Sequence, residues 1–177
     1  MHTVKGQQRQ KKKEQSLARF LDANNIKYER GVRIQHNCQG GTWSEIDFVI
    51  YSDWGAILLE NDEDQHTLSN YTVSCDSGRM GRIGDSMLLA GLNHHAYWIR
   101  YNPDAQRIGG VTVRRSRAEK RAQLLHAIQT ATPGTGSLSV LYLGYDKDTE
   151  DSKMPCICSD PEYAPDVKTC IIDPFIR

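Results

Sequence analysis

Apolar residues recur at every second position in one part of the chain, which is the spacing of a β-strand with one buried face. Residues 44–52 show this alternation through Ile50, and residues 56–59 are apolar without a break, as in a strand buried on both faces. Between them, the sequence Asp-Trp-Gly at 53–55 suits a tight turn, because Asp bonds its own backbone and Gly accepts positive φ. The pattern therefore predicts a hairpin, and its second strand runs directly into a polar segment at 60–66.

Apolar residues at intervals of three and four mark helices elsewhere in the chain. The expected helices are residues 11–24, 73–93 and 114–131. Alternation or a short apolar run marks each of the further strands. These expected strands are residues 26–38, 96–101, 138–145 and 169–172. Helices and strands interspersed in this order predict an α/β fold with a mixed central sheet flanked by helices.

The length of 177 residues suits one domain with its own core. We expect the polar and basic residues 1–10 to be disordered and residues 11–177 to form the domain. No run approaches the roughly 18 apolar residues of a membrane span, and the polar N-terminus does not resemble a secretory signal. Five cysteines, an odd number, favour free thiols in a reducing compartment, so the expected location is intracellular, in the cytoplasm or nucleus.

Positive and negative residues balance in number but are separated along the chain. Lys+Arg and Asp+Glu each total 22, so the net charge says nothing about partners. Basic residues gather in the N-terminal segment, around Lys12, and in residues 107–121, whereas residues 60–64 and 146–151 are acidic. The separation, unlike the net charge, favours a charged partner.

The acidic end of the expected hairpin is the part of the sequence most indicative of chemistry. Strand geometry puts Glu60 and Asp62 on one face of the sheet, about 6–7 Å apart along the chain, and Asp47 can lie across from them. Three buried carboxylates are costly together unless a cation lies among them. Oxygen ligands suit Mg²⁺ or Mn²⁺ rather than zinc. The alternative is a solvated acidic loop, and it applies best to Glu63 and Asp64.

The same residues resemble the motif of a known nuclease superfamily. Asp47 is followed thirteen positions later by Glu60, then by Asp62 in a Glu-x-Asp pattern and by the pair Gln65 and His66. This pattern is similar to that of the PD-(D/E)XK nucleases, in the branch of the very-short-patch-repair endonucleases and related domains of large DNA viruses and mobile elements. The common motif ends in Glu-x-Lys, and Asp62 stands where that lysine would be.

The resemblance covers residues 14–104 and implies a restriction-endonuclease-like αβββαβ core, with residues 105–177 as a C-terminal extension of a helix and strands. The segment IRYNPD at 99–104 adds to it. The implied activity is that of a metal-dependent endonuclease that hydrolyses phosphodiester bonds in DNA. The expected cofactor is Mg²⁺ or Mn²⁺, and RNA is the alternative substrate.

Roles for individual residues follow from the resemblance. Asp47 and Glu60 would ligate the metal together with the backbone carbonyl of residue 61, and Asp62 would complete the shell or hold a second ion. The metal would lower the pKa of an attacking water and stabilise charge on the phosphoryl group. His66 would act as general base or protonate the leaving oxygen, and Gln65 would orient a water or the phosphate.

Auxiliary residues lie on the neighbouring elements. Glu14 matches a helix glutamate found near the metal in the family, although a solvated side chain fits the pattern equally well. Glu45 shares a face with Asp47 and would rim the site or ligate the metal. Arg79 would hold a phosphate or lock the acidic residues, with Arg82 one turn further on; an ion pair within the helix to Asp76 is the alternative.

Arginines also crowd the start of the expected helix 114–131. Arg114, Arg115 and Arg117 lie where cations are unfavourable with the helix dipole, so an external anion such as a DNA backbone is expected there. The alternative is a solvated helix end. Near the C-terminus Cys156, Cys158 and Cys170 lack a fourth ligand for zinc, and a hairpin with buried thiols is the better interpretation.

Two other functions remain compatible with this sequence. One is a degenerate nuclease fold that binds nucleic acid without cutting it, which the missing lysine favours and the intact carboxylates oppose. The other is an interaction module whose acidic residues bind a protein partner.

Overall fold

A computed structural model of the chain describes residues 4–38, 41–63, 73–90, 95–108, 111–132, 139–145 and 169–172. The described helices are α1 (Val4–Ala23), α2 (Val73–Leu89) and α3 (Arg117–Thr130). The first four strands are β1 (Glu29–Cys38), β2 (Gly41–Ser52), β3 (Gly55–Asn61) and β4 (Ala96–Tyr101). The others are β5 (Gln106–Ile108), β6 (Val111–Val113), β7 (Ser139–Leu143) and β8 (Thr169–Ile172).

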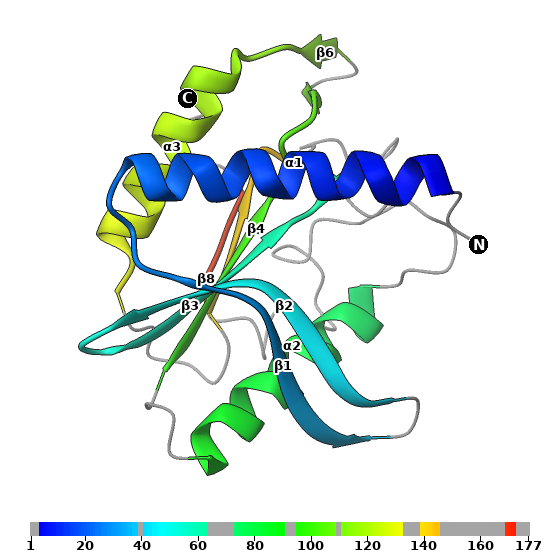
Figure 1. Cartoon of the computed structure of the whole chain (residues 1–177), viewed down its shortest axis with the longest axis vertical. Coiled ribbons are helices and arrows are strands. Elements are labelled where there is room, and N and C mark those ends of the chain that lie inside the picture. Colours follow the sequence, from blue (N-terminus) through cyan, green and yellow to red (C-terminus); the bar gives the residue numbers. More distant parts are fainter. Residues whose placement is uncertain are drawn as a thin grey trace.

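The strands form a mixed six-stranded sheet in the order β1-β2-β3-β4-β7-β8, so the predicted α/β class is confirmed (Figure 1). β1, β2 and β3 run antiparallel to one another, whereas β3, β4, β7 and β8 are parallel. The order α1-β1-β2-β3-α2-β4 reproduces the expected αβββαβ arrangement. β7 and β8 extend the sheet beyond β4, as expected of a C-terminal extension.

Helices cover the sheet on both faces, because alternate side chains of the strands feed two separate core clusters. One cluster joins Val49, Leu58 and Trp98 to apolar residues of α2. The other joins Phe48, Ile57 and Leu59 to apolar residues of α1 and α3. In Figure 1, α1 crosses the strands next to α3, and α2 lies apart from both. Charged residues at the ends of β3 and β4 are thereby divided between an α2 face and an α1–α3 face.

The hairpin of β2 and β3 turns where the sequence predicted, at Asp53 and Trp54, with Ser52 opposite Gly55. Gly55 is required by packing: a Cβ there would lie 2.2 Å from the carbonyl oxygen of His95. Ala56 donates its N–H to that same carbonyl at 3.0 Å. The start of β3 is therefore held directly against the chain that enters β4.

Three local features differ from the expectation. Residues 4–10 continue α1 as a helix instead of being disordered, and their Gln, Lys and Arg residues are good helix formers. The short hairpin of β5 and β6 was not predicted. α3 begins at Arg117 behind a capping box, in which Ser116 accepts from the N–H of Glu119 and the Glu119 carboxylate accepts from the N–H of Ser116. Among the described residues, no helix combines the length and apolar character that crossing a membrane requires.

Candidate active site

Asp47 and Glu60 lie side by side on the antiparallel strands β2 and β3. The register pairs Phe48 with Leu59, so the next pair along brings Asp47 opposite Glu60. The N–H of Asn61 donates to Oδ2 of Asp47 at 2.8 Å, which fixes the carboxylate against the end of β3. The predicted approach of these two carboxylates is confirmed.

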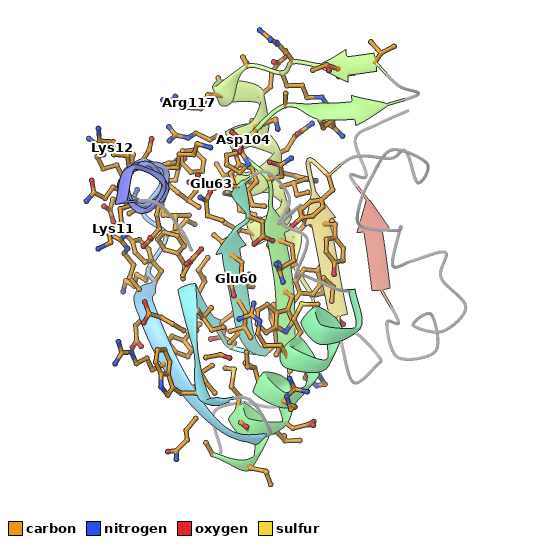
Figure 2. All side chains as sticks on the ribbon, turned by 90° about the vertical axis from the view of Figure 1, so that its right-hand side faces the viewer. Lys11, Lys12, Glu60, Glu63, Asp104 and Arg117 are labelled. Atoms are coloured by element: carbon orange, nitrogen blue, oxygen red, sulfur yellow. The ribbon has the colours of Figure 1, made fainter. Side chains whose placement is uncertain are left out.

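Glu60 is buried and pairs with an arginine from α2. Nη2 of Arg79 lies 2.8 Å from Oε1 of Glu60, and the guanidinium lies over the ring of Trp98, 5.7 Å from its centroid. Of the two roles expected for Arg79, the structure shows the one in which it locks the acidic residues. Figure 2 shows Glu60 on β3, toward α2, with Glu63 and Asp104 nearer the end of the sheet beside α1.

Asp62 differs from the expectation that it completes a metal shell. Its Oδ2 accepts hydrogen bonds from Nε of Arg100 and from the hydroxyl of Tyr145, and all three residues are buried. A carboxylate oxygen shared by two donors is already neutralised, so Asp62 serves a buried ion pair. The sequence interpretation missed Arg100 and Tyr145. The available signal was an arginine inside the apolar strand at 96–101, since a buried cation needs a buried partner.

Among the three carboxylates, Asp47 is the one whose negative charge no cation of the described residues balances. Burial raises the pKa of Asp47 to about 7, with a further contribution from Glu60 that the Asn61 N–H opposes; Glu14 and Asp62 add to the rise. Burial also raises the pKa of Glu60, but Arg79 and Arg100 oppose that rise. Within the described chain Asp47 makes no ion pair, whereas Glu60 and Asp62 each have an arginine. Arginines of the protein therefore balance the charge of Glu60 and Asp62, and only Asp47 still requires a cation.

The auxiliary carboxylates occupy different positions. Glu14 of α1 pairs with Arg30 and lies within electrostatic range of Asp47. Glu45 is exposed and pairs with Arg33 at 3.2 Å on the β1–β2 hairpin, so it belongs at most to a rim. Gln65 and His66 lie outside the described residues.

Among the described residues, no three His, Cys, Asp or Glu side chains gather as a metal site. Asp47 and Glu60 provide two carboxylates, so further ligands would be backbone oxygens or water. The side chain of Asp76, together with Cys156 and Cys158, lies outside the described part of the structure. For Cys170 only the backbone, in β8, is described.

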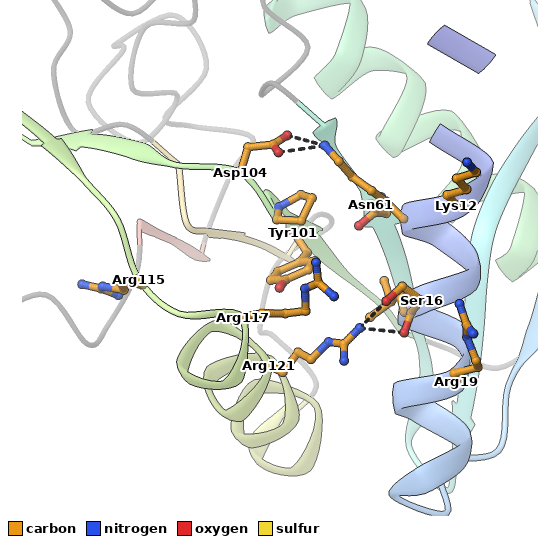
Figure 3. Close-up of a pocket in the computed structure, with 12 residues that line it drawn as sticks. Lys12, Ser16, Arg19, Asn61, Tyr101, Asp104, Arg115, Arg117 and Arg121 are labelled. Carbon is orange, nitrogen blue, oxygen red and sulfur yellow. Dashed lines mark hydrogen bonds and ion pairs between the residues drawn. The ribbon is translucent and has the colours of Figure 1, made fainter. Parts of the chain in front are cut away.

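The arginines expected to bind nucleic acid separate into two groups. Arg115 and Arg117 line a cavity of about 670 Å³, together with Arg121 of α3 and with Lys12, Lys13 and Arg19 of α1 (Figure 3). Arg114 is exposed and does not line this cavity, and Arg82 lies on α2 with its guanidinium above Gly78. The sequence interpretation did not foresee that α1 and α3 combine their cations.

Lys13 connects this basic cavity to the strand ends. Its Nζ donates to both carboxylate oxygens of Asp104, at 2.7 and 3.0 Å, and pairs with Glu63 at 3.2 Å. The side chain of Glu63 is 12% exposed, so the alternative of a freely solvated loop residue does not hold for it. Asp64 lies outside the described residues.

No protein-family model and no curated protein matches this chain. Among solved structures, it is similar to the crystal structure of the protein of unknown function AF1548, with 14% sequence identity and a TM-score of 0.35. The similarity covers 73% of this chain and 56% of that chain. At this TM-score the similarity carries no argument about activity.

Proposed function

We propose that this protein is a metal-dependent endonuclease that hydrolyses phosphodiester bonds in DNA, with RNA as the alternative substrate. The observation that supports the proposal is the carboxylate pair of Asp47 and Glu60, which meet across β2 and β3 where Asp47 faces no cation among the described residues. The sequence resemblance to the PD-(D/E)XK nucleases gives the same two residues the role of metal ligands. The αβββαβ order of elements is compatible with that superfamily.

The residues at this position fit a magnesium ion. Mg²⁺ commonly takes one or two protein carboxylates and keeps several waters, so a third carboxylate is not needed. The two polar groups of a strand residue point toward the same neighbouring strand, and the Asn61 N–H points to Asp47. The Asn61 carbonyl therefore faces the same side and is the candidate third oxygen. A divalent cation there would also relieve the repulsion between Asp47 and Glu60.

When bound, the ion supplies Lewis-acid stabilisation of the charge that develops on the phosphoryl oxygens. Arg79 holds Glu60 in place through its ion pair, and the Asn61 N–H holds Asp47. Asp62 acts through Arg100 and Tyr145 as a positioning residue below the carboxylate pair. His66 remains the proposed general base or acid and Gln65 the residue that orients water or phosphate, since both lie within five positions of the end of β3 in sequence.

The test is cleavage of labelled duplex, nicked, branched and single-stranded DNA, and of RNA, with Mg²⁺, Mn²⁺ or EDTA. Asp47→Ala and Glu60→Ala should both abolish metal-dependent cutting. Glu45→Ala is the matched control, because Glu45 is an exposed carboxylate two residues from Asp47 on the same strand, and it should keep activity. Cutting that persists in Asp47→Ala would refute the proposed ligand pair.

A second candidate is a nuclease fold that binds nucleic acid without cutting it. It is favoured by the ion pairs Arg79–Glu60 and Arg100–Asp62, which occupy two of the three carboxylates with the protein's own cations. The same assay separates the two functions. DNA binding in EDTA, with no cutting under either metal, would support the second candidate over the first.

A further inference from the structure

The cavity between α1 and α3 is distinct from the carboxylate pair, yet adjoins it. Its volume of about 670 Å³ lies within the range of pockets that hold small molecules or cofactors. Asn61 and Tyr101, the last residues of β3 and β4, contribute to its wall (Figure 3). Successive strand residues point to opposite faces, so Glu60 points toward α2 and Asn61 toward the cavity. The Asn61 N–H still donates to Asp47, so one residue joins the two regions.

Positive charge dominates the lining of this cavity. Its basic residues are Lys12, Lys13, Arg19, Arg115, Arg117 and Arg121. Among the described residues that line the cavity, Asp104 is the only carboxylate; it pairs with Lys13, which also pairs with Glu63 just outside the lining. Within the described chain, Lys12, Arg19 and Arg117 make no ion pair. A cavity with this surplus attracts a ligand that carries more than one negative charge.

Arg121, one of the arginines that line the cavity, is held in place by neighbouring residues of the protein itself. Nη2 of Arg121 donates to both the backbone oxygen and the hydroxyl of Ser16, each at 2.7 Å, and its guanidinium lies 5.1 Å from the centroid of Phe20. Burial lowers the pKa of Arg121; Tyr101 opposes this change, while Arg117 and Arg19 lower it further. A guanidinium that neutral partners fix among other cations is a preorganised part of an anion site.

Tyr101 adds a neutral donor to the same wall. Burial raises its pKa to about 12 even though Arg121 and Arg117 oppose the rise, so the hydroxyl keeps its proton at neutral pH. The hydroxyl and the guanidinium groups together suit phosphoryl oxygens, which accept several hydrogen bonds at once.

We propose that the α1–α3 cavity binds the terminal phosphate of a nucleic-acid strand, at an end or a nick, as a phosphomonoester dianion. This inference rests on the proposed function for its substrate, and it narrows that substrate to strands with a phosphorylated terminus. A terminal phosphate carries up to two negative charges and is bonded to the strand on one side, so it can enter a cavity. An internal phosphodiester carries one negative charge and is bonded to a nucleoside on each side. A free nucleotide has the same chemistry and is the competing source of the phosphate.

The test measures binding in EDTA, so that it does not depend on catalysis. Oligonucleotides of one sequence with a 5′-phosphate, a 3′-phosphate or hydroxyl termini are titrated by fluorescence anisotropy at one fixed ionic strength, with a nucleoside monophosphate as competitor. We expect one phosphorylated terminus to bind at least about tenfold more tightly than the hydroxyl terminus. Arg117→Gln should remove most of that preference. Arg114→Gln, which removes the same charge from an exposed neighbour outside the cavity, should keep it.

Equal affinity for phosphorylated and hydroxyl termini would overturn the inference, and so would equal losses in Arg117→Gln and Arg114→Gln. A nucleoside monophosphate that binds as tightly as the phosphorylated strand would overturn the assignment to strand ends. Asp47→Ala should keep the preference for a phosphorylated terminus. The two proposals can therefore fail separately. If the protein prefers a terminal phosphate but cleaves no nucleic acid with either metal, the proposed hydrolysis is refuted and the proposed phosphate site is retained.

Discussion

On the α2 side of β3 the structure brings three carboxylates together with two arginines, whereas on the α1–α3 side it brings six cations together with Asp104 and Glu63, both of which pair with Lys13. Both groups lie at the same end of the parallel strands, and Asn61 takes part in both. In the first group charges are matched inside the protein, except at Asp47. In the second group the positive charges outnumber the negative ones, and the excess is available to an anionic ligand.

The difference separates residues that hold the fold from residues that are available for ligands. Asp62 and Arg100 are 2% and 1% exposed in their side chains and neutralise each other. Arg117 is exposed and makes no ion pair among the described residues. Removing one partner of a buried ion pair lowers the free energy of unfolding, because the other charge is left buried without a partner. An exposed charge without a partner is instead available to bind a ligand of opposite charge. Asp47 is intermediate, since it is largely buried and yet unmatched.

The largest expected effect is on stability and comes from breaking the matched pair. Arg100→Leu leaves Asp62 buried without its arginine and should lower the free energy of unfolding by roughly 3–5 kcal/mol. The double variant Arg100→Leu with Asp62→Leu should recover much of the loss, because no charge then remains buried. Chemical denaturation measures both. A single variant as stable as the wild type would show that this ion pair does not hold the site.

The next effect concerns Asp47 and depends on pH. Its folded pKa of about 7 lies above its ordinary value of 3.8, so its contribution to stability is fully present below about pH 4 and is lost as the pH rises through 7. Asp47→Asn keeps an oxygen that accepts the Asn61 N–H and carries no charge. In EDTA this variant should be more stable than the wild type at pH 8, by up to about 4 kcal/mol, and similar to it at pH 4. Denaturation curves at the two pH values give the difference, and a gap that does not widen with pH would contradict the account.

The smallest effect lies on the basic side. Ser116→Ala removes the N-cap of α3, which carries Arg117 and Arg121, and should cost about 1 kcal/mol of unfolding free energy. Thermal unfolding measures this loss, with the exposed Ala118→Ser as a control on the same turn. A Ser116→Ala variant that loses more stability than Arg100→Leu would reverse the order expected from the two regions.

Much of the fold follows from local patterns in the sequence. The hairpin at Asp53, the strands at 96–101 and 169–172 and the approach of Asp47 to Glu60 all depend on alternation and turn residues. The capping box of Ser116 and Glu119 was also readable as Ser-x-x-Glu. By contrast, the partners of the charged side chains depend on which elements pack together.

Long-range pairing explains what the sequence did not reveal. Lys13 and Asp104 are 91 positions apart, and Asp62 and Arg100 are 38 apart, so no local spacing connects them. The basic cavity likewise needs α1 and α3 to lie side by side on one face. The motif position of Asp62 predicts a metal ligand, whereas its pairing with Arg100 follows only from the way the elements pack.

The central claim is that Asp47 and Glu60 together hold a divalent cation, and it is tested most directly by Mg²⁺ titration followed by thermal unfolding at pH 8. The account predicts a saturable rise in the unfolding temperature of the wild type and of Glu45→Gln. It predicts no rise in Asp47→Asn, although that variant starts from a higher temperature. A Mg²⁺-dependent rise that is the same in Asp47→Asn as in the wild type, or none in the wild type, would contradict it.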